Sequence, residues 1–254
     1  VDFRLLVICD DSPETINIQV DTKNPFYNSY IEIGNIMTSV YDISDFNMIN
    51  VNLKDTLFVR TEFKGGKLKQ DNFNLSIYQT LDTDDTSTFG FKQSRISYND
   101  RLWFINKLSD SNNKIEIERG FQNFNVDSLS LTSGEQSILL DGVLRDTTYK
   151  DIQLSFENVE LLDVMPKRDS LSVGGLLNGQ LDIFQKERLY APNLDISVER
   201  LKFNGVPYGE FSLVANGNKD LSSFDLKSEI INNKNRLFKA EGVIFTKEDE
   251  QYFD

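Results

Sequence analysis

The feature of this sequence that most restricts its fold is the alternation of apolar and polar residues in short segments along the chain. Five segments carry the pattern most clearly: 16–20, 73–77, 115–118, 152–156 and 194–198. Successive side chains of a β-strand point to opposite faces, so this period of two predicts half-buried antiparallel strands. Polar turns separate such segments at a spacing of roughly 10 to 12 residues, which is typical of a long meander.

That spacing implies on the order of 20 strands, whereas a twisted open sheet rarely exceeds about 10 strands without curling or splitting. We therefore expect an all-β, mainly antiparallel meander that folds on itself as a curled groove, a two-sheet sandwich, a closed barrel or a propeller. The chain has only three alanines, which argues against a mainly helical protein. We expect a single β domain over 1–254, with a possible sub-boundary near the polar stretch 82–90.

Glycines recur inside the expected strands. The segments 129–144 and 230–244 share one form: a strand, a polar turn and a second strand that contains Gly142 or Gly242. A glycine inside a strand predicts a bulge or a tight bend, and both help a sheet to curl. The pair Gly174-Gly175 is also expected to form a bend or bulge, because no Lys-Ser/Thr step or helix follows it as a phosphate-binding loop requires.

One short helix is expected near 157–165. Asn158 could cap its N-terminus, and Pro166 would end it. Its apolar face would comprise Val159, Leu161, Leu162 and Met165. About two turns of helix are marginal alone, so we expect this helix to plug or cap the sheet.

Composition excludes several kinds of chemistry. The chain has no histidine and one cysteine, Cys9, so it has no Ser-His-Asp triad, no histidine-based metal site and no internal disulfide. A net charge of −13 makes nucleic acid an unfavourable partner. Trp103 is expected to pack on the apolar face of a strand. We expect no metal and no cofactor, and we expect that the protein is not an enzyme.

Acidic residues are numerous, so a pair of catalytic carboxylates is not excluded by count. The pairs Asp10-Asp11 and Asp84-Asp85 lie in polar runs typical of solvated turns. The stretch 82–87 begins like a calcium-binding loop but lacks its glycine and distal glutamate, so a plain turn is the better interpretation.

Membrane-crossing segments are not evident. The chain has no run of 18 apolar residues. Its first residues do not form a signal peptide, because the apolar core there is too short and acidic residues flank it. We expect the chain to be a piece of a longer protein, cut out of it or processed.

Two segments resemble the TamB family of cell-envelope proteins: NGQLDI at 178–183 and PNLDISVERLKFNGVPYGEFSLVAN at 192–216. The family pattern is a G-x-L-x-G-x-L strand start followed by P-x-L-x-L-x-V-x-x-L-x-x-N-G-x-x-Y-G-x-L-x-L-x-A. Residues 127–142 and 94–106 are similar to further steps, the latter in the form seen in Bacteroidetes-like bacteria. The resemblance covers about residues 50–245 and is that of a C-terminal region.

The resemblance implies a fold and a role. Members of the family are long periplasmic proteins of Gram-negative bacteria that are anchored in the inner membrane. Their sheet curls into a β-taco, a groove with an apolar interior. They cooperate with a BamA-like outer-membrane barrel protein, support outer-membrane protein assembly and carry phospholipid between the two membranes. The family has no catalytic residues to transfer to this chain.

On this basis we expect alternating apolar side chains to line a trough that holds phospholipid acyl chains. The candidate lining residues are Leu129, Leu131, Ile138, Leu140, Ile152, Leu154, Leu194, Ile196, Val198, Phe211 and Leu213. A shift of one residue in register would move each of them to the other face.

Two alternatives stay open. One is a closed β-sandwich, adhesin-like or carbohydrate-binding, with exposed aromatic residues such as Tyr149 and Tyr208 at its loops. The other is a β-solenoid enzyme that acts on polysaccharide, which would need a cluster of carboxylates with shifted pKa values on one face.

Overall fold

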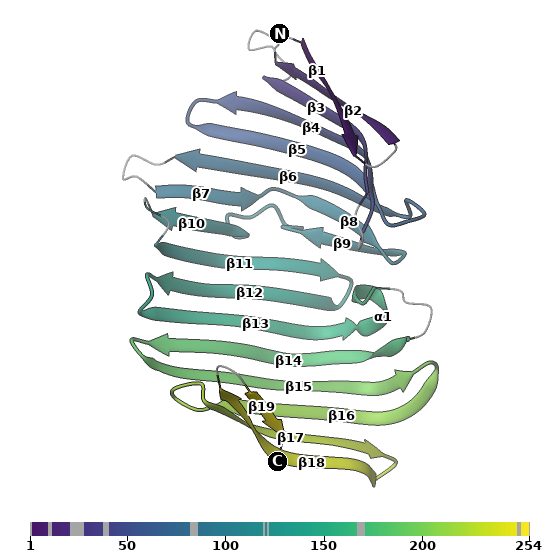
Figure 1. Cartoon of the computed structure of the whole chain (residues 1–254), viewed down its shortest axis with the longest axis vertical. Coiled ribbons are helices and arrows are strands. Elements are labelled where there is room, and N and C mark those ends of the chain that lie inside the picture. Colours follow the sequence, from purple (N-terminus) through teal and green to yellow (C-terminus); the bar gives the residue numbers. More distant parts are fainter. Residues whose placement is uncertain are drawn as a thin grey trace. The chain divides into compact units, whose positions relative to one another are not determined.

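The computed structural model describes residues 2–9, 12–20, 28–37, 41–81, 86–118, 120, 122–166, 171–247 and 250–253. The chain divides into two compact units, Val1–Arg119 (unit 1) and Gly120–Asp254 (unit 2). Each is built from antiparallel strands (Figure 1). The predicted all-β, antiparallel meander is therefore confirmed. Nineteen strands lie in the described residues, against about 20 expected from the turn spacing.

Unit 1 is a meander whose last strands are broken. Its strands are β1 (Asp2–Cys9), β2 (Ser12–Val20), β3 (Ser29–Ile36), β4 (Ile43–Leu53), β5 (Thr56–Gly65), β6 (Asp71–Leu81), β7 (Thr86–Phe91), β8 (Ser94–Tyr98), β9 (Arg101–Ile105) and β10 (Lys114–Glu118). From β1 to β6 each strand pairs with the next. β6 then pairs with β7 along one part of its length and with β8 along another. β7 in turn pairs with β10, and β8 pairs with β9.

Unit 2 is a regular meander of longer strands. Its elements are β11 (Asn123–Ser133), β12 (Gln136–Arg145), β13 (Tyr149–Glu160), α1 (Leu161–Val164), β14 (Val173–Lys186), β15 (Leu189–Phe203), β16 (Val206–Gly217), β17 (Ser223–Asn232), β18 (Asn235–Lys247) and β19 (Glu250–Phe253). Each strand pairs antiparallel with the next along the chain.

Bulges interrupt several of the ladders. In these bulges the chain takes a positive φ at Asp45 in β4, Ser128 in β11, Asn158 in β13, Gly175 in β14 and Arg200 in β15. A bulge takes its extra residue out of the ladder and increases the local bend and twist. Side chains of nearby residues accept from three bulge amides: Asp141 from Ser128 at 2.8 Å, Asn178 from Asn158 at 2.8 Å and Glu160 from Gly175 at 2.9 Å.

The glycine predictions hold at some positions only. Gly175 lies in a bulge between β14 and β15, as expected. Gly142 has a φ of 157° and pairs with Val126 at the end of the β11 bulge, so the irregularity lies in the neighbouring strand and not at Gly142 itself. Gly242 pairs in regular register with Leu226, and the irregularity of that hairpin falls between Ile230 and Ile231 instead. The prediction for Gly242 was therefore wrong.

The predicted helix is present but much shorter. α1 spans only Leu161–Val164, and the preceding residues complete β13 by pairing with β14 as far as Glu160. Asn158 does not cap the helix, because it forms a bulge with a φ of 51°. Strand pairing satisfies the backbone groups of this segment, whereas a free two-turn helix would be marginal. The helix does end before Pro166, as expected.

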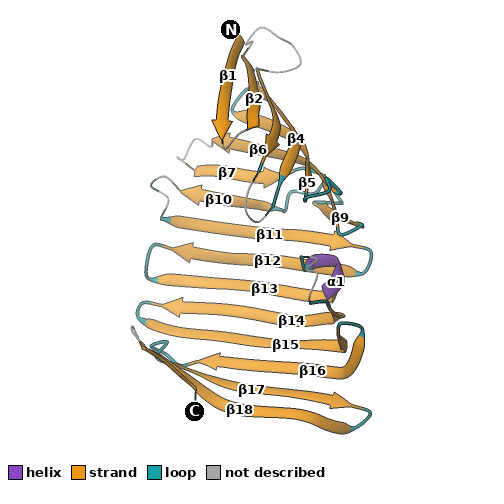
Figure 2. Ribbon diagram, turned by 45° about the vertical axis from the view of Figure 1, so that its right-hand side comes forward, coloured by secondary structure: helices purple, strands orange, loops and turns teal. Residues whose placement is uncertain are grey.

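α1 is anchored at one end of the unit 2 sheet, beside β13 and β14 (Figure 2). Gln136 at the start of β12 donates to Asp163 of the helix at 2.7 Å and accepts from the amide of Glu160 at 2.9 Å. Within the described residues, no helix has the length and apolar character needed to cross a membrane.

Trp103 lies in β9, opposite Ile96 of β8, with 1% of its surface exposed. The prediction that it packs on an apolar face is confirmed. The stretch 82–90 lies inside unit 1, and residues 82–85 are outside the described part.

We expect Gly179→Ala to destabilise the protein, because Gly179 in β14 has a φ of 128° and a Cβ there would overlap the carbonyl oxygen of Asp195. Such backbone positions cost about 1–3 kcal/mol for residues other than glycine. Gly34→Ala is the control, because Gly34 has no positive φ and no atom within 4 Å of its Cβ position. Denaturant unfolding should show a lower midpoint for Gly179→Ala only. Equal midpoints for the two variants would contradict the prediction.

Candidate functional site

The structure places all eleven candidate lining residues on one face of the unit 2 sheet, in four rows of register partners. The first row contains Leu131, Ile138, Phe156, Gly179, Ile196 and Leu213, and the second contains Leu129, Leu140, Leu154, Leu181, Leu194 and Ala215. The third contains Gly142, Ile152, Ile183 and Pro192, and the fourth contains Val159, Leu177, Val198 and Phe211. We call these rows the apolar face.

Sequence reasoning missed several members of the apolar face. Leu181 and Ile183 alternate with polar residues as clearly as the chosen candidates, so the same pattern could have found them. Val159 was assigned to the predicted helix, and only the bulge at Asn158 brings it opposite Leu177. Period-two counting fails across a bulge, because the extra residue shifts the alternation by one.

The apolar face is only partly buried. Ten of the eleven candidates are half-buried, and Val198 is 5% exposed. Among the described residues of unit 2, the buried apolar side chains are Val159, Val198 and Leu201, at 0%, 5% and 4% exposure. All three belong to the end of the sheet where α1 docks near Gly174 and Gly175. Away from α1, therefore, the rows are not packed as a core.

The opposite face of the same sheet is polar. One of its rows contains Asp141, Gln153, Asp182, Asn193, Asn216 and Asp225. Gln153 donates to Asp182 at 2.9 Å, and Asn193 donates to Asn216 at 2.7 Å, so neighbouring strands are also linked through side chains. The unit 2 sheet is thus amphipathic, with one face for water and one for apolar contact.

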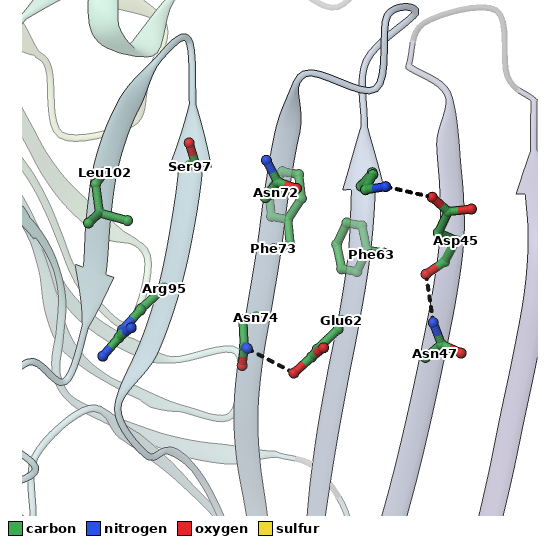
Figure 3. A pocket seen from close by; sticks show the side chains of 11 residues that line it. Asp45, Asn47, Glu62, Phe63, Asn72, Phe73, Asn74, Arg95, Ser97 and Leu102 are labelled. Carbon is green, nitrogen blue, oxygen red and sulfur yellow. Dashed lines mark hydrogen bonds and ion pairs between the residues drawn. The ribbon is translucent and has the colours of Figure 1, made fainter.

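Unit 1 carries a pocket of about 400 Å³ that is lined by polar and apolar residues of β4, β5, β6, β8 and β9 (Figure 3). Lys64 pairs with Asp45 at 2.9 Å, and Asn74 donates to Glu62 at 2.9 Å. The hydrogen bond and charge of Lys64 lower the pKa of Asp45. Four of the polar groups that line the pocket are thus paired with one another, which makes it a weaker candidate than the apolar face.

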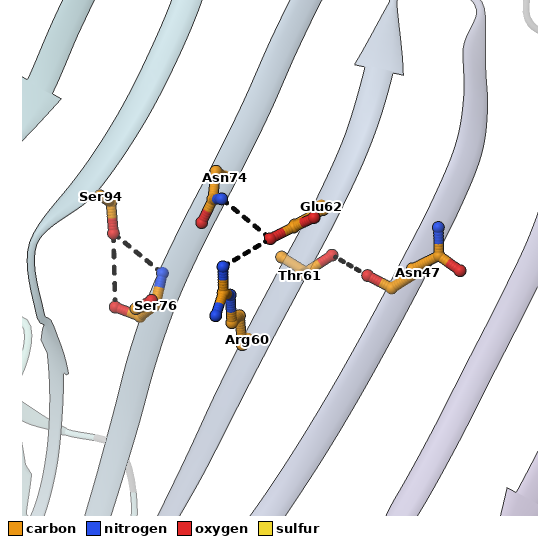
Figure 4. A network of polar contacts seen from close by, with 7 residues as sticks. All are labelled: Asn47, Arg60, Thr61, Glu62, Asn74, Ser76 and Ser94. Atoms are coloured by element: carbon orange, nitrogen blue, oxygen red, sulfur yellow. Dashed lines mark hydrogen bonds and ion pairs between the residues drawn. The ribbon is translucent and has the colours of Figure 1, made fainter.

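A polar network continues from this pocket across the same strands (Figure 4). Arg60 donates to Glu62 at 2.7 Å, and the hydroxyl of Thr61 donates to the carbonyl of Asn47 at 3.1 Å. Ser94, 1% exposed, accepts from the amide of Ser76 at 2.9 Å at the point where β6 exchanges β7 for β8. The network therefore holds together the broken part of the unit 1 sheet.

A hydrogen bond between half-buried Tyr41 and buried Asp71 supports the same region. The hydroxyl of Tyr41 donates to Asp71 at 2.6 Å, and Asp71 is 1% exposed. The ring of Tyr41 meets Phe73, a pocket residue, edge-on at 6.4 Å between centroids. Burial, and after it the hydrogen bond to Asp71, raise the pKa of the Tyr41 hydroxyl well above its usual value.

The aromatic residues of the closed-sandwich alternative lie at opposite ends of the unit 2 strands. Tyr208, near the start of β16, is 37% exposed and meets Phe203 edge-on at 5.4 Å. Tyr149, at the start of β13, meets Phe184 edge-on at 5.8 Å. The structure does not bring the two tyrosines together into one site.

The acidic pairs Asp10-Asp11 and Asp84-Asp85 lie outside the described residues, as does most of the calcium-like stretch. In the part of the chain that is described, no three acidic, cysteine or histidine side chains come together as a metal site would require.

We expect Tyr41→Phe to change the pH dependence of unfolding. The pKa of Tyr41 is raised in the folded state, so this group adds to the free energy of unfolding. That contribution is complete below the usual tyrosine pKa of about 10 and is lost as the pH rises towards the folded-state pKa. The variant should cost about 1–2 kcal/mol at neutral pH, because Asp71 loses a donor. It should then lose less stability than the natural chain between about pH 9 and 11.5. Tyr208→Phe is the control, and parallel pH curves for Tyr41→Phe and the natural chain would refute the argument.

No family model, no curated protein and no solved structure matches this chain.

Proposed function

We propose that unit 2 is a lipid-carrying segment of a TamB-like periplasmic protein, and that its apolar face holds phospholipid acyl chains on their way between the inner and outer membranes. The observation that supports this is an apolar face of four registered rows, of which the first three stay half-buried instead of forming a packed core. The resemblance of residues 178–183 and 192–216 to the TamB pattern supports the choice of lipid.

The proposed mechanism is passive and needs no reactive group. Each CH₂ group that leaves water for an apolar surface gains about 0.8 kcal/mol. The rows of the apolar face cross six strands, β11 to β16, which are spaced about 4.8 Å apart, so they offer a path of about 24 Å. Because every strand from β11 to β16 contributes to the first two rows, an acyl chain can pass between strands without crossing a polar barrier.

The partners and place follow from the same proposal. The parent protein is anchored in the inner membrane, works in the periplasm with a BamA-like outer-membrane barrel protein, and supports outer-membrane protein assembly. The polar face, rich in acidic side chains, stays in water. A net charge of −13 makes nucleic acid an unfavourable partner.

The test is site-specific photocrosslinking of the full chain in the presence of bacterial phospholipid vesicles. A photoreactive phenylalanine analogue replaces Leu154 or Leu194 on the apolar face, or Gln153 or Asp195 as adjacent controls on the polar face. We expect lipid adducts, detected by mass spectrometry, at the first two positions and not at the controls. Each control position is adjacent in sequence to one of the apolar positions, so a difference in adduct yield reports the face of the sheet and not the region of the chain.

Equal adducts at all four positions would indicate non-specific contact, and no adducts at any position would contradict the proposal. In the latter case, protection of Leu154 and Leu194 from solvent labelling would favour the closed β-sandwich, whose apolar face a second layer covers.

A further inference from the structure

We infer that a phospholipid on the apolar face has a fixed orientation, with its phosphate at Lys150 and its acyl chains running along the strands towards α1. This rests on the proposed function and adds a headgroup subsite to it. The inference comes from a difference between the two ends of the apolar face.

Lys150 supplies the positive end. It lies in β13 two residues before Ile152, with no bulge between them, and so belongs to the apolar side of the sheet. Its register partners are Leu144 in β12 and Gln185 in β14, neither of them acidic. The side chain is half-buried and has no ion-pair partner among the described residues. A lysine in this position lays its stem along apolar neighbours and keeps its ammonium group at the water boundary.

The α1 end is closed and contains a carboxylate. Asp163 of α1 lies there and accepts from Gln136, at the start of β12, at 2.7 Å. Val159 and Val198, the buried members of the fourth row, lie at this end. The carboxylate of Asp163 repels a phosphate, and a packed end leaves no space for a solvated headgroup. An acyl terminus is therefore the part of the lipid that fits beside α1.

The length of the apolar face matches an acyl chain. From Lys150 to Phe156 the strand rises about 3.4 Å per residue, which gives about 20 Å. The hydrocarbon core of a bilayer is about 30 Å thick, so one leaflet supplies about 15 Å of chain. A phosphate held at Lys150 thus leaves room for a full chain before the fourth row and α1.

The first test compares two lysines at the same end of the sheet. Lys186 lies opposite Tyr149 in the same ladder, one residue from the Lys150–Gln185 pair, and therefore on the polar side. Lys150→Gln and Lys186→Gln remove the same charge from opposite faces. Binding of the full chain is measured with fluorescent phosphatidylglycerol and with diacylglycerol carrying the same labelled acyl chain.

We expect Lys150→Gln to weaken phosphatidylglycerol binding about tenfold, as for the loss of one hydrogen bond to a charged group. Diacylglycerol binding should not change, and Lys186→Gln should bind both lipids like the natural chain. If each lipid binds Lys150→Gln as tightly as it binds the natural chain, the headgroup subsite is refuted while the proposed function stands. If neither lipid binds the natural chain, the proposed function itself fails.

The second test measures orientation directly. Phospholipids with a photoreactive group either in the headgroup or at the acyl terminus are crosslinked to the natural chain, and the adducts are mapped by peptide mass spectrometry. We expect headgroup adducts around Lys150 and Tyr190, and acyl-terminal adducts around Val159 and α1. The reverse distribution, or the same distribution for both probes, would overturn the inference.

Discussion

The register of the antiparallel ladders is the constraint on which the rest of unit 2 depends. A shift of one residue in any strand would turn its apolar side chains to the polar face, because side chains alternate with a period of two. The observed register instead aligns Leu129, Leu140, Leu154, Leu181 and Leu194 across five consecutive strands. Backbone pairing alone does not select this register, since every shift by two residues keeps the same hydrogen-bonding pattern. Burial of the apolar rows against one another, and the short turns between strands, select it together.

The bulges show how bending and register are reconciled. Each inserts one residue into a strand, which would put the rest of that strand out of phase with its neighbour. At Asn158 the positive φ absorbs the extra residue, so that Val159 returns to the apolar side opposite Leu177. The side chain of Asn178 then accepts from the amide that left the ladder. A buried amide without any partner would cost about 1–3 kcal/mol, so the side chains that accept from the bulge amides contribute to the stability of the fold.

Sequence reasoning succeeds here wherever one local rule decides the outcome. Alternation predicted the strands at 73–77, 152–156 and 194–198, and it placed all eleven candidates on one face. It failed at 157–160, where apolar residues at helical spacing complete β13, because a long-range partner, β14, offers backbone hydrogen bonds that a short helix does not match. It also could not locate the bulge at Arg200 or show that the first three rows of the apolar face stay half-buried. Both depend on contacts between residues far apart in sequence.

An apolar face that stays half-buried is costly in water, since each Å² of apolar surface left exposed forgoes about 25 cal/mol. Contiguous exposed apolar patches larger than a few hundred Å² are rare on proteins without a partner for them. α1 covers one end of the face, where Val159 and Val198 are buried, and leaves the first three rows half-buried. Stability alone would favour packing further elements against this face. The first two rows, which are rich in leucine, offer the apolar surface for such packing. The proposed function accounts for the half-buried rows of unit 2, because an apolar occupant that enters and leaves needs a face that the unit's own side chains do not fill.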